Sequence, residues 1–221
     1  ELKKGKECNM SNLVDNALSI ASSNNDNYKM IFNKFITFIQ NNEKKDTNQL
    51  LNNKLFSNLY KKSKCYPPTN ESTTALSLLK SLESQQNGVI GEVSKKRIKM
   101  FITSSNLYNL ANNPGTKMEE IVNNMLESKA FLKEQHYVGI DYLILQQVQN
   151  ILTDVNKGHE LIKILFEKAK KPQQQQDVME FLLGMLNCES PGEINENVKK
   201  TAQNAYMAIS HKQERYKVSM P

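Results

Sequence analysis

The stretch YKMIFNKFITFI, residues 28–39, places its large apolar side chains at the spacing of an α-helix. These residues recur at intervals of three or one, which keeps all of them on one side of a helix. The same spacing returns in residues 178–186 and 194–209. Strand-like alternation of apolar and polar residues is not evident along the sequence. The pattern therefore predicts an all-α protein.

Residues that favour helix starts and stops divide the chain further. Ser190, Pro191 and Glu193 have the spacing of a capping box with proline in the first turn, and residues 116–119 repeat the spacing of the box. Gly158 follows a position where a left-handed cap would end a helix. These signals predict about ten helices. The expected ranges are 11–23, 26–42, 47–62, 72–87, 90–112, 117–133, 137–157, 159–170, 173–187 and 191–211.

Short connections join the predicted helices, so we expect consecutive helices to pack antiparallel. Each of the five pairs spans roughly 30 to 45 residues, the size of a HEAT, armadillo or TPR unit, although no consensus repeats along the sequence. We predict a single repeat-like domain over residues 1–221 that forms a short solenoid, with a compact helical bundle as the alternative. Because the chain starts at Glu1, we expect a segment of a larger protein or a processed chain.

Positive charge is concentrated in the N-terminal half. Residues 1–110 contain 16 Lys and Arg against 9 Asp and Glu, whereas residues 111–221 contain 13 against 14. Such asymmetry indicates an acidic partner for the first half. Only Arg97 and Arg215 are arginine, however, and arginine is preferred for bidentate contacts with phosphate. A composition bias toward Lys and Asn explains the charge equally well, so both explanations stay open.

The stretch VSKKRIKMFITSSNLYNLANN, residues 93–113, opens with four positive charges in five residues. On a helix that turns about 100° per residue, Lys95 and Lys99 fall on a thin polar stripe opposite a broad apolar surface. The simpler interpretation is the solvated stripe of a core helix. The alternative is a binding patch for nucleic acid that includes the basic end of the third predicted helix. This candidate basic patch comprises Lys61, Lys62, Lys64, Lys95, Lys96, Arg97 and Lys99.

Patterns that carry catalysis or bind metal are missing from the sequence. The three histidines have no Cys, His, Asp or Glu at metal-ligand spacing on a shared helical face. A G-x-S-x-G elbow and a Gly-rich phosphate loop are absent. Asp141 lies on an apolar stripe in the first turn of its predicted helix, where it either caps free N–H groups or is a perturbed catalytic group. We predict no enzyme activity, metal or cofactor, and an enzyme built around Asp141 is the third hypothesis.

The cysteines and the hydropathy pattern indicate where in the cell we expect the protein to be. Cys8, Cys65 and Cys188 are far apart and form no CxxC motif, which is typical of a reducing compartment. Apolar runs in the sequence stay well short of a membrane-spanning length. We therefore expect an intracellular protein, cytoplasmic or nuclear, without a membrane partner.

The expected fold suggests a function by association. Helical solenoids present surfaces that bind extended peptides or partner helices. We predict a non-catalytic scaffold domain for protein–protein interaction that docks a peptide or a partner helix on one face. The alternative is a domain that binds RNA or DNA through the basic N-terminal half, where Tyr60, Tyr66 and Tyr108 lie close to basic residues and would stack on single-stranded bases.

Overall fold

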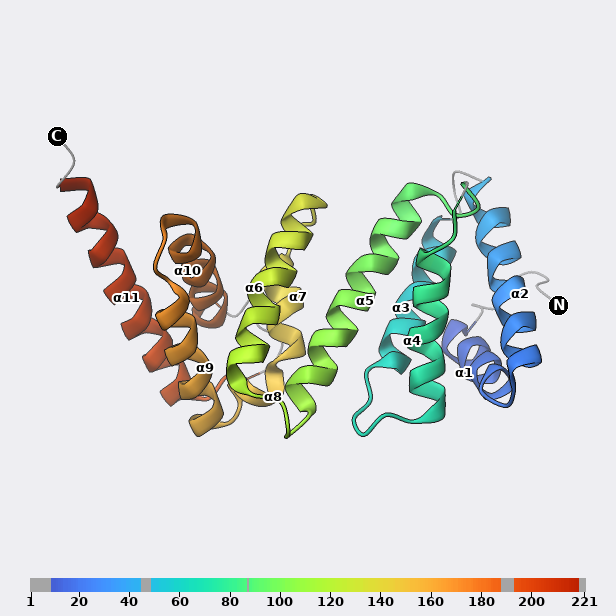
Figure 1. The fold of residues 1–221 in the computed structure, drawn as a ribbon, viewed down its shortest axis with the longest axis horizontal. Coiled ribbons are helices and arrows are strands. Elements are labelled where there is room, and N and C mark those ends of the chain that lie inside the picture. Colours follow the sequence, from blue (N-terminus) through green and yellow to red (C-terminus); the bar gives the residue numbers. More distant parts are fainter. Residues whose placement is uncertain (1–8, 45–48, 87, 188–192, 219–221) are drawn as a thin grey trace. The chain divides into compact units, whose positions relative to one another are not determined.

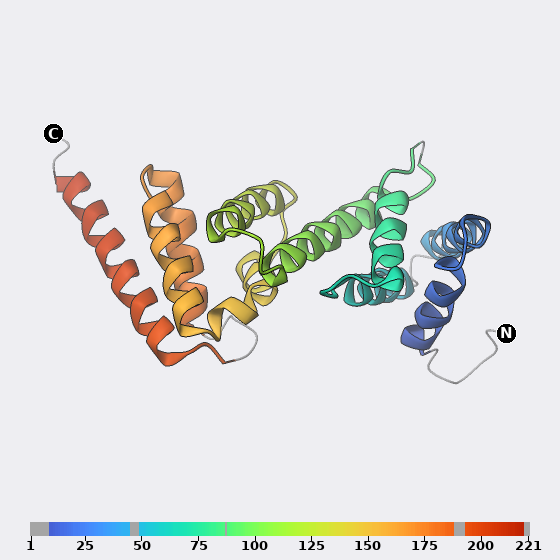
Figure 2. The same cartoon turned by 60° about the horizontal axis from the view of Figure 1, so that its bottom comes forward.

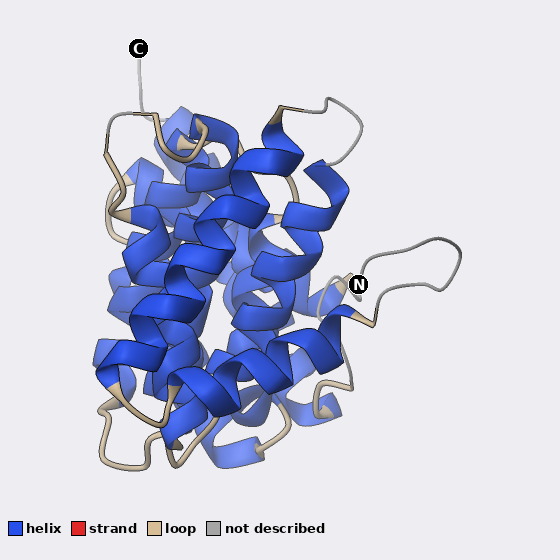
Figure 3. Ribbon diagram, turned by 90° about the vertical axis from the view of Figure 1, so that its right-hand side faces the viewer, coloured by secondary structure: helices blue, strands red, loops and turns tan. Residues whose placement is uncertain are grey.

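The computed structural model describes residues 9–44, 49–86, 88–187 and 193–218, and its regular elements in these ranges are all helices (Figure 3). The all-α prediction is confirmed for this part of the chain. The helices (Figure 1) are α1 (Met10–Ala21), α2 (Asn25–Glu43), α3 (Gln49–Ser63), α4 (Asn70–Glu83), α5 (Glu92–Asn112), α6 (Met118–Glu134), α7 (Ile140–Gln147), α8 (Gln149–Leu152), α9 (Val155–Lys168), α10 (Pro172–Leu186) and α11 (Glu196–Val218).

Contacts between Cα atoms divide the chain into two compact units, which we call unit 1 (residues 1–105) and unit 2 (residues 106–221). In unit 1, helices α1 to α4 pack on one another, and the first part of α5 joins their core through Ile98 and Phe101. In unit 2, α9, α10 and α11 lie side by side (Figure 2), and α6 and α7 pack against this group. The solenoid arrangement of the whole chain stays a prediction.

The apolar stripes predicted from the sequence are buried and form the hydrophobic core between the packed helices. On α2, Ile31, Phe35 and Ile39 are buried, as the opening stretch predicts. On α10, Val178, Phe181, Leu182 and Met185 are buried in the same way. Burying a side chain of this kind contributes about 1.5–3 kcal/mol. Burial of the apolar stripes is therefore the main interaction that packs the helices together. The polar faces of the helices remain at the surface.

The predicted helix over residues 137–157 is wrong in extent. The structure has two short helices there, α7 and α8, and the chain leaves helical geometry between them at Val148, where φ is −105° and ψ is 18°. A new helix, α9, then starts at Val155 because the Asp154 side chain accepts a hydrogen bond of 2.9 Å from the Lys157 backbone N–H. Asp154 is a helix N-cap that was not predicted from the sequence.

Helix starts are corrected at three other places. Residues 116–119 form no capping box, because Lys117 is the N-cap of α6 and its side chain makes no capping bond. α4 starts at Asn70, two residues before its predicted start, and is preceded by a capping box in which Thr69 and Ser72 exchange hydrogen bonds. α11 starts at Glu196 rather than at residue 191, while Ser190 and Pro191 lie outside the described residues.

Gly158 also has a different role from the predicted left-handed cap. It lies inside α9, with its α-carbon against the side chain of Val198 on α11. A Cβ at this position would lie 2.5 Å from Val198 Cγ2 and 2.9 Å from Cγ1. Contact distances this short do not occur between real side chains, so glycine is required for the close approach of α9 and α11.

We predict that Gly158→Ala lowers the free energy of unfolding of unit 2 by about 1–3 kcal/mol, because the added methyl group overlaps Val198. This figure is the net loss that remains after the gain in helix propensity from alanine, about 1 kcal/mol, is subtracted. Adding Val198→Ala should make the Gly158→Ala exchange nearly neutral. Urea unfolding followed by circular dichroism measures each change, with exposed Asn156→Ala as the control in the same turn. A Gly158→Ala variant as stable as the parent chain would contradict the close packing of α9 on α11.

Candidate anion-binding cleft

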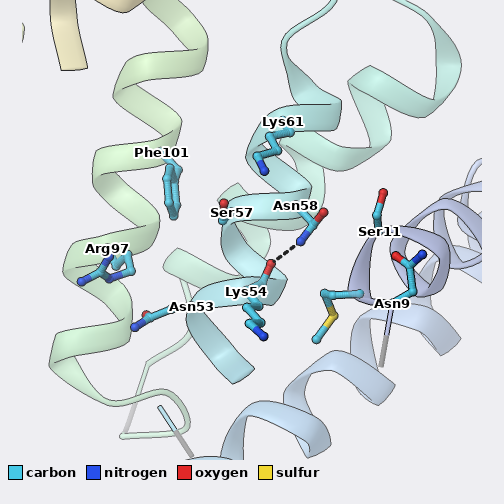
Figure 4. Close-up of a pocket in the computed structure, with 10 residues that line it drawn as sticks. Asn9, Ser11, Asn53, Lys54, Ser57, Asn58, Lys61, Arg97 and Phe101 are labelled. Carbon is cyan, nitrogen blue, oxygen red and sulfur yellow. Dashed lines mark hydrogen bonds between the residues drawn. The ribbon is translucent and has the colours of Figure 1, made fainter. Parts of the chain in front are cut away.

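A cleft in unit 1 brings together part of the candidate basic patch (Figure 4). It has a volume of about 660 Å³ and lies between side chains of α1, α3 and α5. Among the lining residues that the structure describes, three are cationic and none carries a carboxylate. The lining residues are Asn9, Met10, Ser11, Asn53, Lys54, Ser57, Asn58, Lys61, Arg97 and Phe101.

Helical periodicity explains how α3 contributes to this cleft. Lys54, Asn58 and Lys61 are spaced by four and three residues, so they share one face of α3. Asn53 and Ser57 lie beside them on the same helix (Figure 4). The Asn58 side-chain amide donates to the backbone oxygen of Lys54 at 2.8 Å. The exposed polar face of α3 therefore supplies half of the lining residues.

The opposite wall of the cleft comes from α5. Arg97 and Phe101 are one helical turn apart on α5 and both line the cleft, and Phe101 lies on the side of α5 that faces α3 in Figure 4. Phe101 stacks on Tyr60 of α3 with ring centroids 4.7 Å apart, and both rings are more than nine-tenths buried. Lys64 Nζ lies 4.3 Å from the centroid of the Tyr60 ring. The two stacked rings are thus buried next to Arg97 and leave little aromatic surface open to the cleft.

Three of the seven residues of the candidate basic patch have other contacts within unit 1. Lys62 pairs with Asp15 at 2.7 Å, and Lys99 pairs with Glu83 at 3.5 Å. Burial lowers the pKa of Lys64, and the nearby charge of Lys61 lowers it further. Lys62 and Lys99 are therefore paired with acids of unit 1, and Lys64 is partly buried against the Tyr60 ring.

The remaining four residues of the patch separate into two groups. Lys61 and Arg97 line the cleft, whereas Lys95 and Lys96 do not. Arg97 stands one turn before buried Phe101, so it does not belong to the polar stripe of α5 on which Lys95 lies. The cleft therefore contains two of the seven residues of the candidate basic patch.

The sequence analysis missed Lys54, the third cation of the cleft. Its signal is the spacing of Lys54, Asn58 and Lys61, which marks a polar face of α3. Within the described part of the chain, the side chains of Lys54, Lys61 and Arg97 make no ion pair or hydrogen bond. Their charge is therefore available to a ligand. A cavity of this size falls in the range of about 300–1,000 Å³ that is typical of ligand sites.

Asp141 neither caps its helix nor stands alone. The N-cap of α7 is Gly139, and the Asp141 carboxylate accepts a hydrogen bond of 2.6 Å from Lys129 Nζ on α6. His159 Nδ1 lies 2.9 Å from the hydroxyl of Thr201. Among the described residues, no group of three or more His, Cys, Asp or Glu side chains is placed to hold a metal ion.

Lys129 is the centre of an ion-pair network in unit 2. Its side chain is only 1% exposed, and its Nζ lies 2.6 Å from Asp141 and 2.6 Å from Glu180. Lys133 extends the network to Asp177 at 2.5 Å and to Glu180 at 3.4 Å. A buried ammonium group is costly unless it is paired, so these contacts hold α6, α7 and α10 in one arrangement. The charged groups of this network are therefore paired with one another within unit 2.

Comparisons with models of protein families, with curated proteins and with solved structures find no match for the chain. Across the described ranges, every helix is too short or too polar to cross a membrane. The function of the cleft is therefore inferred from its own residues, their charges and their contacts.

We predict that Lys129→Ala lowers the free energy of unfolding of unit 2 by about 3–5 kcal/mol, because it leaves Asp141 without its cationic partner and leaves Glu180 with the longer contact to Lys133. Asp141 and Glu180 are 23% and 32% exposed, so water offsets part of the loss and the lower end of the range is expected. Urea unfolding measures the change. Exposed Lys163→Ala is the control and should stay within about 0.5 kcal/mol of the parent chain.

Acid should weaken unit 2 through Glu180. Burial alone raises the pKa of this carboxyl, but hydrogen bonds from Lys129 and Gln176 and the charge of Lys129 outweigh it and lower the pKa to about 2. The stabilisation is therefore complete above the ordinary pKa of 4.5 and is lost as the pH falls from there through about 2. Urea unfolding across this pH range checks the sign, and Glu180→Gln should reduce the loss. An unchanged acid dependence in that variant would contradict the role of Glu180.

Proposed function

We propose that this chain is a non-catalytic interaction domain that docks a protein partner, and that the cleft of unit 1 receives an acidic segment of this partner. The observation that carries the proposal is the lining of the cleft, with three cations and no carboxylate. Arg97 suits bidentate contact with a carboxylate, while Lys54 and Lys61 act as point charges beside it. Side-chain amides and hydroxyls of α3 add neutral hydrogen-bonding groups.

Nucleic acid is the second candidate ligand, because the same three cations suit a phosphate backbone. Single-stranded nucleic acid also binds through aromatic side chains whose faces are open for base stacking. Here Tyr60 and Phe101 stack on each other and are only 6% and 7% exposed. The cleft therefore has charge for a polyanion without an open stacking platform, which favours a carboxylate-bearing peptide.

The same proposal includes where the interaction takes place and how the partner lies. We propose a reducing compartment, the cytoplasm or the nucleus, and docking along one face of the helical array. Support for the compartment is the wide spacing of the cysteines, of which Cys65 is a free thiol within the described chain.

The test is fluorescence anisotropy of the full chain with a labelled, glutamate-rich peptide of about a dozen residues and with a single-stranded RNA of similar charge. The double variant Lys61→Glu with Arg97→Glu should weaken peptide binding at least about tenfold at low salt, because it reverses two of the three cleft charges. The parent complex should weaken as salt is added.

The matched control is Lys95→Glu with Lys96→Glu, which changes the net charge by the same amount through two residues of α5 that do not line the cleft. It should change peptide affinity by less than about threefold. Equal losses in the two double variants would show that net charge alone matters and would overturn the proposal. Tighter binding of RNA, lost only in the cleft variant, would replace the peptide with nucleic acid.

A further inference from the structure

Unit 1 has a second pocket, and its chemistry is the opposite of that of the cleft. α1 contributes Leu13, Ala17 and Ile20, and α2 contributes Phe35 and Phe38. Seven of the eight lining residues are apolar, and the pocket has a volume of about 280 Å³. An engineered apolar cavity of about 150 Å³ holds benzene, so this pocket has room for one large apolar side chain.

The rim of the pocket is open to solvent. Ile20 remains 43% exposed although it lines an apolar surface. Interfaces gain most of their free energy from one or a few large side chains that enter such pockets and are surrounded by polar contacts. The pocket therefore has the form of an anchor site.

Charge identifies the kind of molecule that carries the anchor. Lys34 is the single polar residue of the pocket lining, it is exposed, and it makes no ion pair within the described residues. The cleft in the same unit has three cations and no carboxylate among its described lining residues. A nucleic acid has no aliphatic side chain to bury, whereas an acidic peptide segment satisfies both Lys34 and the pocket.

We infer that this pocket receives one large apolar side chain from an acidic segment of the protein partner, with an acidic residue of that segment paired with Lys34. The inference rests on the proposed function and adds an apolar anchor to the acidic ligand. The pocket and the cleft share no lining residue, so each is changed by variants that leave the other intact.

The experiment selects peptides of about a dozen residues from a random display library on the full chain. Enriched sequences should combine acidic residues with one large apolar residue. Replacing that residue by alanine in a synthetic peptide should weaken binding about tenfold or more. Methyl NMR signals of Leu13, Ile20 and Ile31 should shift when the peptide with its anchor binds, and not with the alanine peptide.

Variants of the chain locate the anchor. Ile20→Ser should weaken binding of the anchored peptide at least about threefold and leave binding of the alanine peptide unchanged, whereas Lys34→Glu should weaken binding of both peptides, because both keep the acidic residue that pairs with Lys34. Both side chains are exposed in large part, so folding is expected to survive and circular dichroism checks it. Met207→Ser is the matched control, because Met207 is 48% exposed on α11 in unit 2.

Each other outcome overturns the inference in a distinguishable way. Acidic peptides that need Arg97 but no apolar anchor would leave the proposed function standing and remove the anchor site. Enriched peptides without acidic residues would overturn both. Methyl shifts produced by decanoate but not by any selected peptide would make the pocket a site for a small apolar ligand. Self-association that Ile20→Ser abolishes would assign the pocket to a second copy of the chain.

Discussion

Burial of one apolar stripe per helix is the constraint on which the rest of the structure depends. A helix with such a stripe is stable in water only when a neighbour covers it. On α3, Leu55, Phe56 and Leu59 are buried for this reason. The face that carries Lys54 and Lys61 is then left at the surface, between α1 and α5. The cleft is therefore a consequence of core packing rather than a separate feature of the chain.

The two units differ in whether their charged side chains form ion pairs within the protein. In unit 2, Lys129 is enclosed by carboxylates, and the energetic cost of burial makes this network part of the fold. In unit 1, Lys62 and Lys99 pair with acids, but the three cations of the cleft pair with no acid among the residues that the structure describes. A cation without an internal partner costs little at a solvated surface and attracts anions there. This contrast supports a binding role for the cleft and a structural role for the Lys129 network.

Much of the fold was predictable, and the reasons are local. Periodicity alone identified α2 and α10, because a helical stripe is visible within a few turns of sequence. Boundaries were less predictable. Thr116 has the residue type of a cap but does not act as one, and Asp154 was passed over although it starts α9. A cap depends on backbone geometry that neighbouring helices set, so the residue type by itself does not decide where a helix starts.

The sequence by itself determined the helical class, the apolar stripes and the surplus of positive charge in the first half of the chain. The tertiary structure alone decided which of those charges remain available. It joined Arg97 to Lys54 and Lys61 from a different helix, and it paired Lys62 and Lys99 with distant acids. It also made Gly158 a packing contact for Val198 and enclosed Lys129. Such pairings join residues far apart in the chain, and local periodicity has no information about the neighbours that packing provides.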